Sequence, residues 1–400
     1  MKKLLLFLFC LLVYGAALFA QGGVDSLNVE TESLSTPTKV KKVFFNGYIS
    51  GLYVPIYTFD TKEFQNIGWL HNRLNLKWMP GKNWDISVEL RTRMIFQDFR
   101  GYNRAQYKDF TQDQGWLNLG WNIATSKYML LTTSVERLYV AYQTERWSFK
   151  VGRQRINWSQ ALTFNPNDIF NGYSFFDFDY PERQGSDAIR LCSYPTGTSV
   201  VELAAKLNYF GKLTIAGLYR FNVKGWDLQL LGGLVNSADL TIGTAFSGDI
   251  KGVNLRGEFS YYHSILAHPE LKNTYLATIG VDYIFNNSLF LSVSGMYNRL
   301  PKDSLSNLNM LLTAPMSPKY LSITEWTVCA QISYPFIPIV TGSFTIMSFI
   351  NSPLFYFGPS IDYSALNNLT LSATAQIFTS FSKVKSSNMI LGYLRLKYNF

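Results

Sequence analysis

The feature that most constrains this chain is an alternation of apolar and polar residues in stretches of roughly ten residues, the spacing that transmembrane strands use. In 84–97, for example, Trp84, Ile86, Val88 and Leu90 occupy every second position, and the residues between them are polar or charged. Successive side chains of a β-strand point to opposite faces, so each such stretch predicts a strand with one apolar and one polar face. The sequence therefore predicts an all-β protein.

The stretches predict an antiparallel sheet of 16–18 strands. The eighteen candidates lie near residues 43–57, 67–78, 84–97, 131–143, 147–158, 186–194, 199–209, 213–221, 226–235, 240–247, 252–263, 274–285, 289–299, 323–334, 339–350, 354–363, 369–380 and 390–400.

The connections between these strands indicate a membrane protein rather than a soluble sandwich. Every second connection is a short turn, whereas most of the others are long, among them 98–130, 159–185 and 300–322. Bacterial outer-membrane barrels combine short periplasmic turns with long extracellular loops in this way. Only 16% of the residues are charged, against roughly 25% in an average soluble domain. We therefore predict one transmembrane β-barrel over residues 43–400, with its apolar faces toward lipid.

The N-terminus has the form of a secretory signal peptide over residues 1–20. Lys2 and Lys3 precede an apolar run with small residues toward its end, and cleavage is expected after Ala20, with Ala17 as the alternative. Residues 21–42 are polar and aperiodic, which predicts a periplasmic tail. These features predict export to the outer membrane of a Gram-negative bacterium, where lipid and the barrel-insertion machinery are the expected partners.

The C-terminus ends on an alternating strand in which Leu394, Leu396, Tyr398 and Phe400 share one face. A terminal aromatic residue on such a strand resembles the signal by which the insertion machinery recognises its clients. We assign that signal to Tyr398 and Phe400. Because hydrocarbon offers no partner to a free strand edge, the first and last strands are expected to pair and close the barrel. A barrel of this size encloses a water-filled lumen, so we expect a passive channel.

One stretch interrupts the regular pattern. Phe149 and Val151 are on the lipid-facing parity, and Arg153 and Arg155 continue it. An arginine that faces lipid costs about 2–4 kcal/mol at the bilayer midplane. We therefore expect a β-bulge near Gly152 that turns both arginines inward.

The loop that follows, 159–185, is rich in aromatic and charged residues and is expected to fold into the pore and narrow it. The alternative is an extracellular loop whose ion pairs only keep it folded. The predicted constriction residues are Arg153, Arg155, Asp168, Asp179, Arg183, Asp187 and Arg190.

This passage also resembles a known family. The run Gly152–Trp158, then Asn165-Pro166 with Asp168, then Pro181-Glu182-Arg183, and Asp187-Ala188 with Arg190, is similar to a strand–loop–strand passage of monomeric outer-membrane porins of the alginate-export-like type and their uncharacterised relatives. The remainder of the chain resembles them only as a generic barrel. The resemblance implies a monomeric substrate channel with an arginine-lined constriction, and it does not identify the solute.

The polar strand faces predict the charges of the pore wall. Basic residues are in modest excess among the charges expected to face inward, which favours anionic or polar solutes. The basic residues are scattered along strands, so nucleic-acid binding is not expected. The predicted wall residues are His71, Arg73, Lys77, Glu89, Arg91, Arg93, Arg256 and Glu258.

Enzymatic function has little support in the sequence. Three histidines and no zinc-protease or esterase motif argue against catalysis, cofactors and metals. The second hypothesis for the function is a barrel that anchors an assembly or secretion component without catalysing a reaction. The least favoured hypothesis is a membrane-embedded lipid hydrolase that uses Ser260 and His263. Cys192 and Cys329, on strands expected to lie far apart, are predicted to be unpaired.

Overall fold

A computed structural model describes residues 42–98, 113–171, 185–267, 269, 271–301, 317–380 and 388–400. Every regular element in this part of the chain is a strand, as predicted. The strands are β1 (Val43–Thr58), β2 (Glu63–Trp78), β3 (Trp84–Phe96), β4 (Gly120–Thr125), β5 (Met129–Gln143), β6 (Trp147–Gln154), β7 (Ser186–Thr196), β8 (Ser199–Leu207), β9 (Leu213–Val223), β10 (Trp226–Val235), β11 (Asp239–Ile250), β12 (Val253–Ser264), β13 (Asn273–Ile284), β14 (Phe290–Asn298), β15 (Trp326–Ile337), β16 (Val340–Ile350), β17 (Leu354–Leu366), β18 (Leu369–Ser380) and β19 (Asn388–Asn399).

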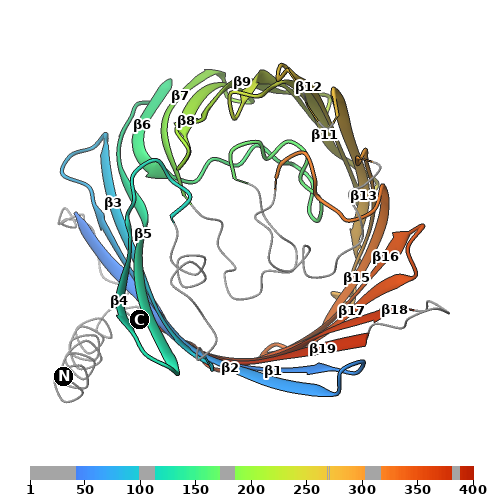
Figure 1. Ribbon diagram of the computed structural model, residues 1–400. Helices are drawn as coiled ribbons and strands as arrows, with labels where there is room; N and C mark the ends of the chain where they lie inside the picture. The colour runs from blue at the N-terminus through green and yellow to red at the C-terminus, as the bar shows by residue number, and fades with distance from the viewer. Residues whose placement is uncertain are drawn as a thin grey trace, which may run out of the picture.

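The strands form one closed antiparallel sheet. Each pairs with its neighbours along the chain, except that β3 pairs directly with β5, and β1 pairs with both β2 and β19. The wall is thus an 18-stranded closed barrel, which confirms the predicted fold class. Figure 1 shows the strands as a closed ring, with connecting segments lying inside it. No helix in the described part of the chain is long and apolar enough to cross a membrane.

The closing strand β19 pairs with β1, and this pairing extends to Phe400. Tyr48–Thr58 of β1 pairs with Met389–Asn399 of β19. Beyond that ladder, the backbone N–H of Phe400 donates to the carbonyl of Gly47 and the N–H of Gly47 to the carbonyl of Phe400, both at 3.0 Å. A side chain at Gly47 would meet the carbonyl oxygen of Arg73 at 2.2 Å, so this close approach requires glycine. Phe400 therefore belongs to the wall.

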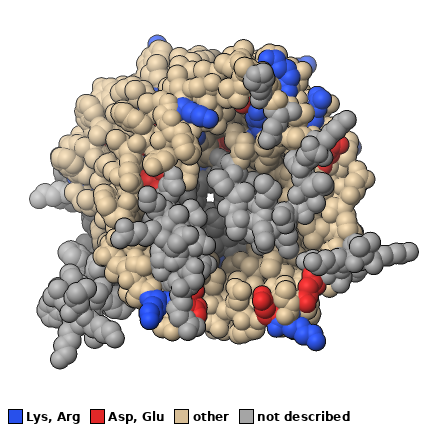
Figure 2. Space-filling view, in the orientation of Figure 1, with Lys and Arg blue, Asp and Glu red and all other residues tan. Residues whose placement is uncertain are grey.

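The two faces of each strand differ as the alternation predicts. In β15, Trp326, Val328 and Ile332 are exposed on the outer face, whereas Thr327 and Cys329 are buried on the inner face. The same holds around the ring, so large apolar side chains cover the outside. Viewed from one end, the described surface carries only small groups of charged side chains (Figure 2).

Short turns join the strands at one end of the barrel, as predicted after every second wall strand. Aromatic side chains flank such turns: Trp84 and Tyr142 meet edge to face with ring centroids 5.0 Å apart, and Asn83 donates to the Tyr142 hydroxyl at 3.2 Å. Cys192 in β7 and Cys329 in β15 are unpaired, which also agrees with the prediction.

Strand β4 was not predicted. It lies within the expected loop 98–130 and pairs with β5 on the side where β6 has already ended. From β4, residues 113–119, here called the covering segment, extend toward β8, where Gly115 forms a bridge with Asn208. The covering segment and β4 thus extend the sheet along the part of β5 that β6 does not reach.

The orientation of β15 gives a direct test of which face meets lipid. Ile332→Lys places a charge on the outer face and is expected to lower the free energy of unfolding in lipid vesicles by about 2–4 kcal/mol. Ser333→Lys, one residue later, faces the lumen and is expected to cost less than about 1 kcal/mol. Urea titrations followed by tryptophan fluorescence measure both, and equal losses would contradict this orientation.

Candidate functional site

The chain leaves the barrel wall after Gln154, and the residues that follow lie inside the ring. Residues 155–171, here called the inward segment, run along the inner surface past β7–β12 (green in Figure 1). The expected strand 147–158 therefore ends four residues early. Of the predicted loop 159–185, residues 159–171 lie in the lumen, and residues 172–184 fall outside the described residues.

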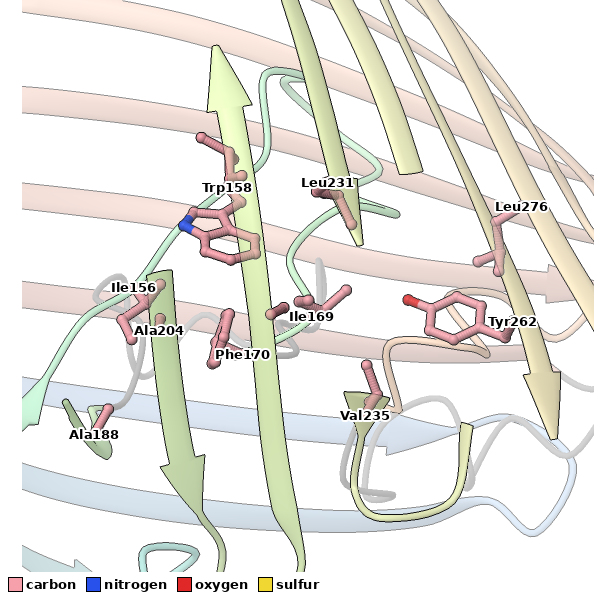
Figure 3. Close-up of a cluster of buried hydrophobic side chains, with 12 residues drawn as sticks. Ile156, Trp158, Ile169, Phe170, Ala188, Ala204, Leu231, Val235, Tyr262 and Leu276 are labelled. Carbon is pink, nitrogen blue, oxygen red and sulfur yellow. The ribbon is translucent and has the colours of Figure 1, made fainter. Parts of the chain in front are cut away.

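Apolar side chains of the inward segment pack against the wall. Trp158 and Phe170 meet edge to face with ring centroids 4.8 Å apart, and both are almost fully buried. Together with Ile156 they lie beside Ala204 and Leu231, which are wall residues of β8 and β10 (Figure 3). The inward segment covers this apolar patch of the inner surface and thereby shields it from the lumen.

Polar groups of the wall hold Trp158 at both ends. Its indole N–H donates to Glu202 Oε1 at 2.6 Å, and its backbone carbonyl accepts from Gln229 Nε2 at 2.7 Å. Glu202 also accepts two hydrogen bonds from Arg190, at 2.6 and 2.7 Å. The Arg190 guanidinium is therefore held in the plane of one carboxylate, with 28% of its side chain exposed.

Glu258 of β12 is the most extensively bonded acceptor of the inward segment. The backbone N–H groups of Gln160, Ala161 and Asn167 all donate to its carboxylate, the last two at 2.7 and 3.0 Å. The Ser159 hydroxyl donates to it at 2.7 Å. Glu258 was predicted as a pore-wall residue, and only 3% of it is exposed because the inward segment covers it.

Asn167 fixes the turn of the inward segment to two adjacent strands. Its Nδ2 donates to the carbonyl of Thr244 at 3.0 Å, and its Oδ1 accepts from the Ser260 hydroxyl at 2.7 Å. Ser260 is within 2.9 Å of the Pro166 carbonyl as well. A Cβ at Gly243 would lie 2.5 Å from Asn167 Oδ1, so the absence of a side chain there leaves room for the amide.

A second stretch, residues 317–325, also lies against the inside of the barrel. Lys319 pairs with Asp239 at 2.9 Å, and Leu321 packs against both buried apolar clusters of the inner wall. The Tyr262 hydroxyl lies 3.4 Å from the carbonyl of Pro318 and 3.4 Å from that of Pro166. The two inward stretches therefore meet at this tyrosine.

Arg153 is the centre of a buried ion-pair network at the end of β6. It bonds Asp187 at 2.7 and 2.9 Å and Asp113 at 2.5 Å, and donates to the carbonyls of Val135 and Leu117 at 3.0 and 2.7 Å. These bonds use every donor that a guanidinium has. Only 5% of its side chain is exposed.

The expected bulge near Gly152 is not present. Pairing of β6 with β5 and with β7 runs through Gly152 without a shift. The extra residue is instead Glu136, because Leu90 and Glu89 of β3 pair with Val135 and Arg137. A bulge in the neighbouring strand buries Glu136 and Arg137 side by side.

The predicted constriction residues do not form a single cluster. Arg153 and Asp187 share the network above, and Arg190 pairs with Glu202. Asp168 is buried in the inward segment, and its Oδ1 accepts the backbone N–H of Asn171 at 3.3 Å. Two of the other residues, Asp179 and Arg183, fall outside the described residues, and Arg155 follows β6 directly and is exposed.

Most of the predicted wall charges lie together on β2 and β3. Arg73 pairs with Glu89, and Lys77 with Asp85 at 3.1 Å. Arg91 donates to His71 Nε2 at 3.1 Å. The predicted Arg93 lies opposite His71 in the register, and on the other side of the barrel Arg256 of β12 pairs with Asp282 at 3.4 Å.

Lysine and arginine are distributed unevenly around the described inner wall. Cations on the inward parity lie on β19, β2, β3, β6, β7, β8, β9 and β12, including Lys397, Lys77, Arg190 and Arg256. Strands β13–β18 contain no lysine or arginine, and their inner faces carry mainly hydroxyl and amide side chains with Asp282 and Asp362. An uneven distribution of fixed charge around the ring creates a field across the lumen.

The arrangement lacks the geometry of a hydrolase at Ser260. Ser260 faces the lumen and donates to the inward segment, whereas His263 is on the opposite parity of β12 and contacts Asn273 Oδ1 at 2.9 Å. Within the described residues, no group of three or more His, Cys, Asp or Glu side chains could hold a metal ion.

Several residues that organise the site were not predicted. Asp113 and Gln229 act through tertiary contacts with Arg153 and Trp158, for which one sequence carries no signal. Glu136 had a signal, since Glu136-Arg137 places two charged residues in succession within an alternating strand. Two successive charges mark a break of parity, and hence a bulge.

Comparison of the sequence with protein-family models and with curated proteins finds no match. Crystal structures with a similar fold include OccAB2 of Acinetobacter baumannii (10% identity, TM-score 0.58, 91% of this chain and 99% of that chain). OccK11 (OpdR) of Pseudomonas aeruginosa is similar over 90% of this chain and 96% of that chain, at 9% identity and a TM-score of 0.56. OpdQ of the same organism covers 90% and 99% of the two chains, at 8% identity and 0.56. These similarities establish the barrel fold.

Replacement of Arg153 tests whether this arginine stabilises the wall or contacts the solute. Arg153→Ala would leave Asp113 and Asp187 buried without their cation, which is expected to cost about 3–5 kcal/mol of unfolding free energy. Arg146→Ala, in an exposed turn, is the control and is expected to change it by no more than about 0.5 kcal/mol. Urea titration in lipid vesicles compares them, and a small loss for both would argue that Arg153 is not a structural residue.

Proposed function

We propose that this protein is a channel of the bacterial outer membrane, through which small hydrophilic solutes diffuse passively, with anions favoured. The observation that carries this proposal is a closed barrel with an apolar exterior and a polar interior whose lysines and arginines lie on strands other than β13–β18. Lipid solvates the exterior, and an 18-stranded ring is wide enough for a water-filled lumen. Such a channel needs no cofactor and performs no reaction.

The charged wall supports the preference for anions. Lys77 is 47% exposed and Arg190 28%, so both retain contact with the lumen although each has an acidic partner. Strands β13–β18 offer mainly hydroxyl and amide groups, which hydrogen-bond polar solutes, and their two inner carboxylates, Asp282 and Asp362, are engaged by Arg256 and by the Ser372 hydroxyl. An arginine can bind carboxylate, phosphate or sulfate through two parallel hydrogen bonds.

The constriction is proposed to consist of two parts with different tasks. Arg153 and Asp187 hold the wall, because all donors of that guanidinium are used within the protein. Arg155 and Arg190 are the cations of this region that we assign to solute contact. This division keeps the arginine-lined constriction that the alginate-export-like resemblance implies, and the proposed working unit is the monomer.

Planar-bilayer recording tests the channel. The purified protein is expected to give discrete conductance steps and, in a salt gradient, a reversal potential of an anion-preferring pore. Absence of steps would contradict the proposal, and a stable co-purifying protein in that case would support the alternative of an anchored assembly or secretion component.

The source of the selectivity has its own test. Lys77→Gln with Lys397→Gln removes two cations from the inner wall and is expected to move the reversal potential toward that of a cation-preferring pore. Lys224→Gln with Lys251→Gln, in short turns outside the lumen, removes the same charge and is expected to move it much less. Equal shifts for the two pairs would mean that the inner wall does not set the selectivity.

A further inference from the structure

Glu258 is a buried anion without a cationic partner in the described part of the chain. It is 3% exposed, and its neighbours on the inner face of β12 are Ser260 and Arg256, the second of which pairs with Asp282. Among the described residues, the groups that balance its charge are hydrogen-bond donors of the inward segment. A buried carboxylate of this kind is stable only while those donors remain in place.

The donors in turn depend on Glu258. Residues 155–171 form no strand or helix, so their backbone N–H groups have no ladder to join. Oε1 accepts from the N–H groups of Gln160 and Ala161 and from the Ser159 hydroxyl, and Oε2 accepts from the N–H of Asn167. One carboxylate therefore joins the two ends of the turn between residues 159 and 167 and ties both to the wall.

The wall around Glu258 is shaped for the same turn. Ser260, two residues along β12, bonds the Pro166 carbonyl and Asn167 Oδ1, and Gly243 on β11 leaves the room that the Asn167 amide fills. Phe164 of the turn packs into the apolar cluster of β14–β19, beside Met296 and Phe378. The turn thus reaches from β12 toward the far wall, across the path of a solute.

We propose that Glu258 is the positioning residue that sets the aperture of the channel, by holding the inward segment across the lumen. This inference rests on the proposed function. Its carboxylate occupies an anion site made of backbone N–H groups, and the segment keeps its place only while an anion fills that site.

The first experiment compares Glu258→Ala with the wild type in planar bilayers. The variant is expected to show a conductance raised by about twofold or more, because the lumen cross-section governs ion flow. It should also show more open-channel noise and admit larger neutral polyethylene glycols. Asp362→Ala is the matched control, since it removes one acidic side chain from the inner face of β17 whose hydrogen-bond partner is Ser372 of β18 and not the inward segment, and it is expected to leave the polymer size limit unchanged.

Chemical rescue separates positioning from general structural damage. Formate or acetate added to Glu258→Ala is expected to refill the anion site and to lower the conductance and the noise toward wild-type values, whereas chloride at the same ionic strength should not. Wild-type values for Glu258→Ala without any added carboxylate would overturn the proposal, and so would a raised conductance that carboxylate leaves unchanged.

A second measurement does not depend on conduction, so it distinguishes failure of this inference from failure of the channel proposal. Amide hydrogen exchange at Gln160, Ala161 and Asn167 is expected to be on the order of tenfold faster in Glu258→Ala than in the wild type. If Glu258→Ala does not fold, Gly243→Ala displaces Asn167 from the other side, with Gly295→Ala, where a Cβ meets nothing within 4 Å, as control. Unchanged exchange at these amides would overturn the proposal.

Discussion

Satisfaction of the backbone in hydrocarbon is the constraint on which the rest of this structure depends. A strand edge inside a membrane has no water to bond, so the sheet must close on itself. The pairing of β1 with β19, extended by Phe400 and Gly47, achieves that closure. Once the ring is closed, polar side chains have only the lumen to face, and its width follows from the number of strands.

The departure of the chain from the wall after Gln154 sets this barrel apart from a plain ring. A segment that leaves the sheet exposes backbone groups on itself and on the strands it abandons. Here the abandoned edge of β5 is paired by β4, and Arg153 satisfies the carbonyls of Val135 and Leu117. Within the lumen, Glu258 and Gln229 satisfy the segment itself. Each break in the ladder is thus compensated from a neighbouring strand, either by backbone pairing or by a charged or amide side chain.

The predictable part of this structure is the part governed by local periodicity. Alternation of residues such as Trp84, Ile86 and Val88 predicted the fold class, the eighteen wall strands and the faces on which Arg73 and Glu258 lie. Periodicity gave a wrong prediction where residues on the same strand face had different neighbours, some facing lipid and others covered by another part of the chain. Arg153 was expected to need a bulge in its own strand, whereas the bulge is at Glu136 in the next strand, and burial by the covering segment removes Arg153 from lipid. Partners far apart in sequence, such as Asp113 and Arg153, carry no local signal.

The Arg153 network also fixes an order of events during assembly. Its cation comes from β6, one carboxylate from β7 and the other from Asp113, before β4. The N–H of Leu117 donates to Asp187 while its carbonyl accepts from Arg153, so this pair of contacts can form only after β6 and β7 are in register. Residues 113–119 precede both strands in synthesis, but their contacts with Arg153 and Asp187 can form only after both strands are in place. Residues 113–119 therefore complete a part of the wall that is built from strands later in the sequence. In a nascent barrel they cannot make the contacts with Arg153 and Asp187 until β6 and β7 are both in place.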